Sequence, residues 1–346
     1  MIFPQKNKLN IHPKRTLRIG VDAMGGDNAP SAAVAGAVLA VKEYNYKLVL
    51  VGQEQSIKKE LQKIEYSSDM IEIVNATGII EMHDPAALSV RKKRDSSIVL
   101  GMDHLKKGEF DAFVSAGNTG AVVCAATLSL RLLPGVDRPG IAVIFPTLTK
   151  PCMVIDVGAN IDPKPFHLLQ YGIMGDAYSK HILGKKNPSV ALLNIGEEES
   201  KGTDFVKESH LLLSESELNF IGNAEPKDVY WGKSDVVVAD GFVGNVMLKV
   251  TEGFADAATE LLKRELKKSN ILTKFGALMT LPAFRSLKKK VDANEYGGAP
   301  LMGVDGNVII AHGSADPKAI KNAVRVAAET VINDVNKHIV EELQSY

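Results

Sequence analysis

Short apolar runs alternate with helix-like runs along most of the chain. The apolar runs are rich in Val, Ile and Leu, and they cover residues 17–21, 46–52, 70–77, 112–117, 141–147, 152–158, 189–196, 218–223 and 235–241. Helix-like runs follow the first two of them, at 31–44 and 54–64, and another covers 96–108. This alternation predicts an α/β fold with a mostly parallel sheet and helices on its faces. Continuous apolar strands indicate that both faces of the sheet are covered.

The first apolar run leads into the segment VDAMGGDNAP, which places Asp22, Gly25 and Gly26 where a strand turns into a helix. Ligands of open α/β sheets bind beside the carboxyl ends of the strands. Glycine lets the backbone approach a ligand closely, and the N-terminus of a helix favours anions. The alternative interpretation is a tight turn in which Asn28 or Ser31 caps the following helix.

Five of the apolar runs end in small, polar loops, namely DAMGGD, SAGNTGA, DVGAN, NIGEEESKG and ADGFVGN. We expect these loops to form one site at one edge of the sheet, although loops between strands and helices are often rich in glycine without binding anything. Their main-chain N–H groups and hydroxyl or amide side chains are typical of a site for an oxyanion such as phosphate. The candidate phosphate- and substrate-binding residues are Asp22, Gly25, Gly26, Ser115, Gly117, Asn118, Thr119, Gly120, Asp156, Gly158, Asn160, Asp240, Gly241, Gly244 and His312.

Three further side chains have two interpretations each. Lys201 supplies a point charge for an anion, or it is a solvated loop lysine beside three glutamates. Asn245 comes where a helix begins, so it is either a helix cap or a donor to an oxyanion. His312 stands at a strand end before a helix, where it serves the site or is a structural histidine.

Three acids, Asp22, Asp156 and Asp240, lie beside a predicted anion site. Their negative charge would repel an anion, so they must have another role. They either orient hydrogen-bond donors or bind a cation such as Mg²⁺, and we favour the orienting role. No metal and no cofactor are therefore expected. The chain contains no GxSxG, HExxH, GxxxxGK[ST] or GxGxxG motif, which leaves a serine hydrolase, a zincin or a Walker-type NTPase without direct support.

A basic and apolar segment runs from Lys263 to Lys290, with nine Lys or Arg residues against one acid, Glu265. With the amphipathic run before it, the segment predicts a helical hairpin over 246–291 that turns near Gly276–Pro282. An apolar tip with basic flanks is typical of helices that contact anionic membranes. Alternatively, the hairpin forms a dimer core with a solvated charged face, since two hairpins can pack as a bundle. The residues expected at the tip are Phe275, Leu278, Met279 and Leu281.

The composition fits a soluble globular protein that stays in the cytoplasm. The chain has 346 residues, 45% hydrophobic and 24% charged, and a net charge of zero, so no global field recruits nucleic acid. Two cysteines without metal-type or disulfide spacing are typical of a reducing compartment. Residues 1–16 lack the apolar core of a signal peptide and predict a flexible tail before a single catalytic domain over 17–346.

The segments VDAMGGDNAP, SAGNTGA, DVGAN, NIGEEESKG, ADGFVGNV, EYGGAPLMG and AHGSAD occur in this order. The ordered set closely resembles the PlsX family, the bacterial phosphate acyltransferases of phospholipid synthesis. The resemblance runs from about Arg18 to Val331. It implies a homodimer with a three-layer α/β/α fold like that of isocitrate and isopropylmalate dehydrogenases. It also implies an enzyme bound peripherally to the membrane through a helical tip.

The same resemblance implies the reaction. A long-chain fatty acyl group passes from acyl carrier protein to inorganic phosphate, and the acyl phosphate then feeds a membrane glycerol-3-phosphate acyltransferase. The family's active-site lysine and asparagine match Lys201 and Asn245. Phosphate is itself the nucleophile, so the enzyme chiefly positions it and stabilises the oxyanion. We expect Lys201 to neutralise negative charge, and Asn245 to donate a hydrogen bond to phosphate or to the carbonyl oxygen.

Three rival functions remain. A phosphotransacetylase-like enzyme acting on acyl-CoA would also bind phosphate, but its reaction gives less reason for an apolar, basic hairpin. A dehydrogenase or decarboxylase needs an acidic metal cluster and a nucleotide-binding segment, and neither can be assigned in the sequence. A non-enzymatic membrane scaffold would not need polar loops at so many strand ends.

Overall fold

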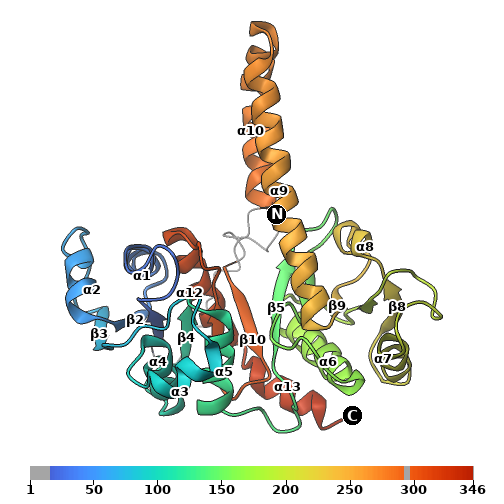
Figure 1. The fold of residues 1–346 in the computed structure, drawn as a ribbon, viewed down its shortest axis with the longest axis horizontal. Helices are drawn as coiled ribbons and strands as arrows, with labels where there is room; N and C mark the ends of the chain where they lie inside the picture. Colours follow the sequence, from blue (N-terminus) through green and yellow to red (C-terminus); the bar gives the residue numbers. More distant parts are fainter. Residues whose placement is uncertain (1–15, 292–296, 346) are drawn as a thin grey trace.

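The structure, a computed structural model, describes residues 16–291 and 297–345. The expected N-terminal tail therefore lies almost wholly outside the described residues. Figure 1 shows a central sheet with helices packed on both of its faces, as the α/β/α expectation requires. In spatial order the strands of the 11-stranded sheet are β3 (Ile71–Asn75), β2 (Lys47–Gly52), β1 (Arg18–Asp22), β4 (Ala112–Ser115), β11 (Val308–Ile310), β10 (Ala299–Met302), β5 (Gly140–Phe145), β6 (Cys152–Ile155), β9 (Val236–Val238), β7 (Val190–Leu193) and β8 (Phe220–Ala224).

The sheet consists of two parallel blocks that run in opposite directions. The first block holds β3, β2, β1, β4 and β11, and the second holds β6, β9, β7 and β8. Between them, β10 and β5 pair antiparallel with each other and with their outer neighbours β11 and β6. The strand ends of the two blocks therefore point in opposite directions. The prediction of a single sheet edge is wrong, while that of a single site stays a prediction. β10, which reverses the first block, was not predicted.

Helices cover both faces of each block. On the first block, α1 and α12 share an apolar cluster on one face, and α4 and α5 belong to a cluster on the other. On the second block, α6 packs against α7 and α13. The helices outside the arm are α1 (Ser31–Tyr44), α2 (Glu54–Leu61), α3 (Ala86–Lys92), α4 (Ser97–Lys106), α5 (Thr119–Ser129), α6 (Pro165–His181), α7 (Asp204–Ser214), α8 (Pro226–Trp231), α12 (Pro317–Ile332) and α13 (Val335–Leu343).

A long helical hairpin, here called the arm, projects from the sheet (Figure 1). It consists of α9 (Gly241–Lys268) and α10 (Ile271–Val291), so it begins five residues before the predicted start at 246. The turn lies at 269–270 rather than near Gly276–Pro282, because the Asn270 side chain accepts a hydrogen bond from the N–H of Thr273 (2.9 Å) and starts α10 there. Pro282 lies inside α10.

The apolar residues expected at the tip of the arm are all exposed, although they lie one or more turns below it on α10. The exposed apolar residues nearest the turn are Ile271 and Leu272. Within the described part of the chain, no helix combines the length and the apolar character needed to cross a bilayer. The apolar residues expected at the tip are Phe275, Leu278, Met279 and Leu281.

Ionisable groups fasten α13 onto α6. Lys180 Nζ lies 2.5 Å from Asp176 Oδ2 and 3.3 Å from Glu342 Oε1. Burial, and then the neighbouring Asp176 carboxylate, raise the pKa of Glu342 from 4.5 to about 7. The folded protein therefore holds the Glu342 proton more tightly than the unfolded chain does.

This contact predicts a pH-dependent stability. A carboxyl group whose pKa is raised by folding stabilises the fold at low pH, and that contribution is lost as the pH rises from about 4.5 to about 7. Compared with wild type, Glu342→Gln should therefore lose less stability between pH 5 and pH 8 in urea unfolding. The control is Glu208→Gln, which changes an exposed carboxyl group on α7 and should follow wild type. Parallel curves for wild type and Glu342→Gln would contradict the prediction.

Candidate active site

The loops after β1 and β4 are held together by a buried carboxylate. Asp22 Oδ2 accepts a hydrogen bond from Ser115 Oγ (2.7 Å), and Asp22 Oδ1 accepts one from the N–H of Met24 (3.0 Å). Ser115 Oγ in turn accepts from the N–H of Gly117 (3.1 Å). Burial raises the pKa of Asp22, while its hydrogen bonds oppose the shift. A Cβ on Gly25 would lie 2.6 Å from the main-chain nitrogen of Gly117, so glycine is what lets the two loops approach this closely.

Asn118 has a structural role in the loop after β4. Its Oδ1 accepts from the N–H of Ala121 (3.0 Å) and caps α5. Its amide nitrogen donates to three main-chain carbonyls, so the side chain has no donor left for a ligand. Thr119 and Gly120 are exposed in the first turn of α5, where N–H groups have no partner within the helix. The three carbonyls belong to Glu81, Met82 and Asp84.

The loop after β1 is also tied to the loop after β11. The N–H of Asp27 donates to the carbonyl of Gly313 (2.8 Å), and Asn28 Nδ2 donates to the carbonyl of Ser314 (3.3 Å). The helix α1 has no side-chain cap, so the interpretation of Asn28 or Ser31 as its cap is wrong. Gly26, in the same loop, has a φ of +96°, which glycine adopts readily.

His312 links the loops of the first block to the arm. Its Nε2 lies 3.2 Å from Lys249 Nζ on α9, and its Nδ1 lies 2.8 Å from Ser314 Oγ. Lys249 also pairs with Glu252 (2.8 Å). His312 is therefore the predicted site residue that connects the two blocks.

In the second block, Asp156 organises the loop after β6. Its Oδ1 accepts from the N–H groups of Ile141, Gly158 and Ala159, and its Oδ2 accepts from that of Asn160, at 2.8–3.0 Å. Burial raises the pKa of this carboxyl, and the four N–H donors oppose the shift. Donors fill much of the space around both oxygens, which favours the orienting role over a Mg²⁺ ligand.

The first N–H groups of α9 are already occupied. Asp240 Oδ1 caps the helix by accepting from the N–H groups of Phe242 (3.0 Å) and Val243 (2.9 Å). The N–H of Gly241 donates to the carbonyl of Asn160 (2.9 Å). Asp240 is thus a helix cap, and the start of α9 does not offer the free amides that the sequence suggested for phosphate.

Glycines let α9 lie directly on the loop after β6. A Cβ on Gly244 would lie 2.0 Å from the carbonyl oxygen of Asp156, and one on Gly241 would lie 2.5 Å from that of Asn160. Asn245 follows in the second turn of α9, so it is not a cap. Its side chain is exposed beside Gly158, and among the described residues its amide has no hydrogen-bond partner.

Lys201 lies in the loop after β7 with its side chain exposed. Asn194 Nδ2 donates to the carbonyl of Lys201 (3.2 Å), which closes the loop. Two of the three neighbouring glutamates are engaged elsewhere, because Glu197 pairs with Lys233 (2.9 Å) and Glu199 lies 3.8 Å from His210. Within the described ranges no carboxylate pairs with the Lys201 ammonium, which makes it available to an external anion.

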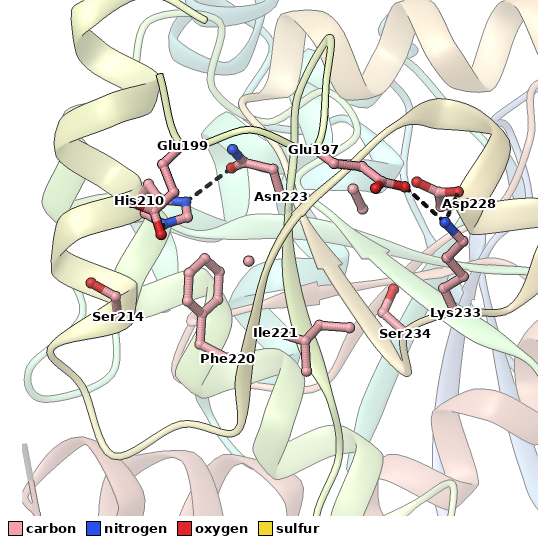
Figure 2. Close-up of a pocket in the computed structure, with 12 residues that line it drawn as sticks. Glu197, Glu199, His210, Ser214, Phe220, Ile221, Asn223, Asp228, Lys233 and Ser234 are labelled. Carbon is pink, nitrogen blue, oxygen red and sulfur yellow. Dashed lines mark hydrogen bonds and ion pairs between the residues drawn. The ribbon is translucent and has the colours of Figure 1, made fainter. Parts of the chain in front are cut away.

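A cavity of about 600 Å³ lies on the other side of this loop, beside the edge strand β8 (Figure 2). Sequence reasoning missed it, and neither Lys201 nor Asn245 lines it. Glu197, Glu225 and Asp228 bring three carboxylate oxygens within 4.8 Å of one another. Lys233 Nζ, however, lies 2.9 Å from Glu197 and 2.8 Å from Asp228, so an ammonium group already serves two of the three acids.

The sequence that carries these loops matches one protein family over almost its whole length. The family model described as "Fatty acid synthesis protein" matches residues 17–338. Phosphate acyltransferases from Dictyoglomus turgidum and Aquifex aeolicus are 50% and 49% identical to the chain, covering 94% and 95% of it and 98% and 97% of the relatives. The chain belongs to the phosphate acyltransferase family.

Solved structures share the fold of this chain at low sequence identity. A phosphotransacetylase from Streptococcus pyogenes superposes with a TM-score of 0.64 and 17% identity, covering 92% of this chain and 94% of that one. A putative 4-hydroxythreonine-4-phosphate dehydrogenase from Salmonella typhimurium gives 0.50 and 13%, covering 91% and 99%. The expected dehydrogenase-like α/β/α fold is therefore confirmed.

Apart from His312, the predicted site residues of the chain fall into two groups. The first-block group is Asp22, Gly25, Gly26, Ser115, Gly117, Asn118, Thr119 and Gly120. The second-block group is Asp156, Gly158, Asn160, Lys201, Asp240, Gly241, Gly244 and Asn245. β7 and β9 pair side by side with Leu192 opposite Val238, so Lys201 and Asn245 follow the ends of neighbouring strands.

The contact between Gly244 and Asp156 predicts a costly substitution. Gly244→Ala should lower the free energy of unfolding by about 1–3 kcal/mol, because its Cβ would clash with a main-chain oxygen that cannot move aside. The control is Gly253→Ala in the same helix, where no atom lies within 4 Å of the new Cβ. That change should stabilise the helix by up to about 1 kcal/mol. Equal effects of the two substitutions in urea unfolding would contradict the packing.

Proposed function

We propose that this protein transfers a long-chain fatty acyl group from acyl carrier protein to inorganic phosphate, and that the acyl phosphate enters phospholipid synthesis. Membership of the phosphate acyltransferase family supports acyl transfer to phosphate. The observation that carries the assignment of the site is the pair Lys201 and Asn245. One is an ammonium without a carboxylate partner and the other an amide without a hydrogen-bond partner in the described chain, and they follow neighbouring strands.

The chemistry requires positioning more than activation. An oxygen of hydrogen phosphate attacks the thioester carbonyl carbon, the new C–O bond forms, and the C–S bond breaks. The sulfur leaves as a thiolate and takes up the proton of the hydrogen phosphate, giving acyl phosphate and the free thiol. Lys201 offsets the charge of the phosphate, and Asn245 donates to the carbonyl oxygen as it becomes an oxyanion.

Other site residues act by holding these two in place. Asp156 fixes the loop on which α9 rests, and Asp240 caps α9, so together they set the position of Asn245. Asn194 closes the loop that carries Lys201. The mechanism that we propose uses no metal and no cofactor.

Replacing either proposed active-site residue should abolish most activity without unfolding the protein. Lys201→Ala and Asn245→Ala should each lower kcat by about 100-fold or more, the typical loss of one oxyanion donor or charge. The assay mixes palmitoyl-carrier protein with phosphate and traps acyl phosphate with hydroxylamine. Lys207→Ala, an exposed lysine on α7, is the matched control. Wild-type rates in both site variants would refute the assignment.

The donor thioester distinguishes the proposal from the phosphotransacetylase-like alternative. An enzyme built for acyl-CoA should use palmitoyl-CoA as well as it uses the carrier-protein thioester. The proposed enzyme should prefer the carrier protein, whose acidic surface is attracted to the lysines and arginines of the arm. Release of free carrier must depend on phosphate, since simple thioester hydrolysis does not.

The arm is the proposed membrane contact. Its exposed side chains include Phe275 and Leu278, and lysines flank them on both sides in the sequence. Such helices lie in the plane of an anionic lipid surface and bring the enzyme to it from the cytoplasm. Peripheral attachment would let the acyl phosphate pass to a membrane glycerol-3-phosphate acyltransferase. We also propose a homodimer, in which two arms pack as a bundle.

A charge placed on the arm should release the protein from lipid. Leu278→Glu should reduce co-sedimentation with phosphatidylglycerol vesicles severalfold, because it replaces an exposed apolar contact with an anion facing anionic lipid. Leu211→Glu changes another exposed leucine, on α7, and should bind like wild type. Unchanged sedimentation of Leu278→Glu, with its oligomeric state preserved, would rule out the arm as the anchor.

A further inference from the structure

Three large apolar side chains stand exposed around the proposed active site. Ile161, Ile195 and Phe242 are 75%, 78% and 60% exposed, and we call them the apolar rim. They follow β6, β7 and β9, whose spatial order in the sheet is β6, β9, β7. The rim is therefore contributed by three neighbouring strand ends.

Contacts of the main chain hold the rim residues near one another. The carbonyl of Asn160 accepts a hydrogen bond from the N–H of Gly241 (2.9 Å). Ile161 and Phe242 are the next residues along the chain, so this bond holds their main chains close together. On the other side of β9, the register of β7 places Leu192 opposite Val238. Ile195 follows Leu192 by three residues in the chain.

Each side of the rim connects to one of the two proposed active-site residues. Phe242 precedes Asn245 by three residues on α9, so the two side chains lie one turn apart on the same side of the helix. Ile195 belongs to the loop that Asn194 closes onto the carbonyl of Lys201. A carbonyl group held between Lys201 and Asn245 would bring its attached chain to the rim.

We propose that the apolar rim binds the methylene groups of the fatty acyl chain next to the carbonyl, and so makes the enzyme selective for long chains. The proposal rests on the proposed function, because it needs an acyl donor at Lys201 and Asn245. A hydrocarbon chain makes no hydrogen bonds, and burying it against exposed apolar side chains removes both surfaces from water. Along α9, Val246 and Val250 follow Phe242 at four-residue spacing and are also exposed, so the apolar surface continues toward the arm.

Chain length is the readout that separates this role from a merely structural one. The substrates are carrier-protein thioesters from acetyl to palmitoyl, so that docking of the carrier is the same for all. In wild type, kcat/KM should rise with chain length. Ile195→Ser combined with Phe242→Ser should lower kcat/KM about tenfold for palmitoyl and less than twofold for acetyl, which has no methylene group to contact the rim, mainly through KM. Both side chains are exposed, so the fold should tolerate the change.

The matched control is Leu148→Ser. Leu148 is 72% exposed in the connection between β5 and β6, at the amino end of β6 and hence at the other end of the strand from Ile161. It should leave the dependence on chain length unchanged. An equal loss for all chain lengths in the rim variant would overturn the proposal. So would a change in its oligomeric state by sedimentation, because the rim would then be a subunit interface.

Failure of the proposed function would look different. If wild type forms no acyl phosphate from any thioester, the function itself is wrong and the rim has no substrate to bind. If wild type is active and phosphate-dependent but the rim variant keeps the wild-type slope of kcat/KM on chain length, only the rim proposal fails.

Discussion

The carboxylate of Asp156 is the contact on which the second block depends. It accepts four main-chain N–H groups and is fully buried, so the loop after β6 has one defined path. The helix α9 lies on that path so closely that only glycine fits at Gly241 and Gly244. This contact fixes the position of Asn245, the residue after Gly244. An exposed amide on a rigid support loses little freedom when it binds, which is what preorganised catalysis requires.

The same helix joins the proposed chemistry to the proposed membrane contact. α9 has 28 residues and is about 42 Å long, so it reaches from the loop after β6 to the turn of the arm. Near its start, Lys249 contacts His312 of the first block, although the strands of the two blocks run in opposite directions. One rigid element therefore touches both blocks and ends at the surface proposed for lipid.

Much of the fold could be predicted because apolar strands and their polar ends are local signals. Arg18–Asp22 and Ser31–Tyr44 match the expected strand and helix within a residue. Strand direction was not predictable in this way, because β10 joins residues far apart in sequence through pairing that leaves no periodic trace. The turn of the arm was misplaced because Gly276 and Pro282 looked like breakers, whereas the decisive residue was the cap Asn270.

Residue types predicted polar loops at the strand ends, but they did not predict which hydrogen bonds each residue makes there. Asp240 and Asn118 were expected to face a ligand. Instead, a side-chain oxygen of each accepts hydrogen bonds from main-chain N–H groups in the first turn of a helix. Capping by Asp240 puts a carboxylate where a phosphate would otherwise meet free amides. A dianion near that cap is repelled unless a cation offsets the carboxylate. Glu197 and Glu199 are directed to Lys233 and His210, so no carboxylate of the described residues pairs with the Lys201 ammonium, which we propose fills that role. The proposed phosphate site therefore depends on side-chain charge more than on the helix dipole.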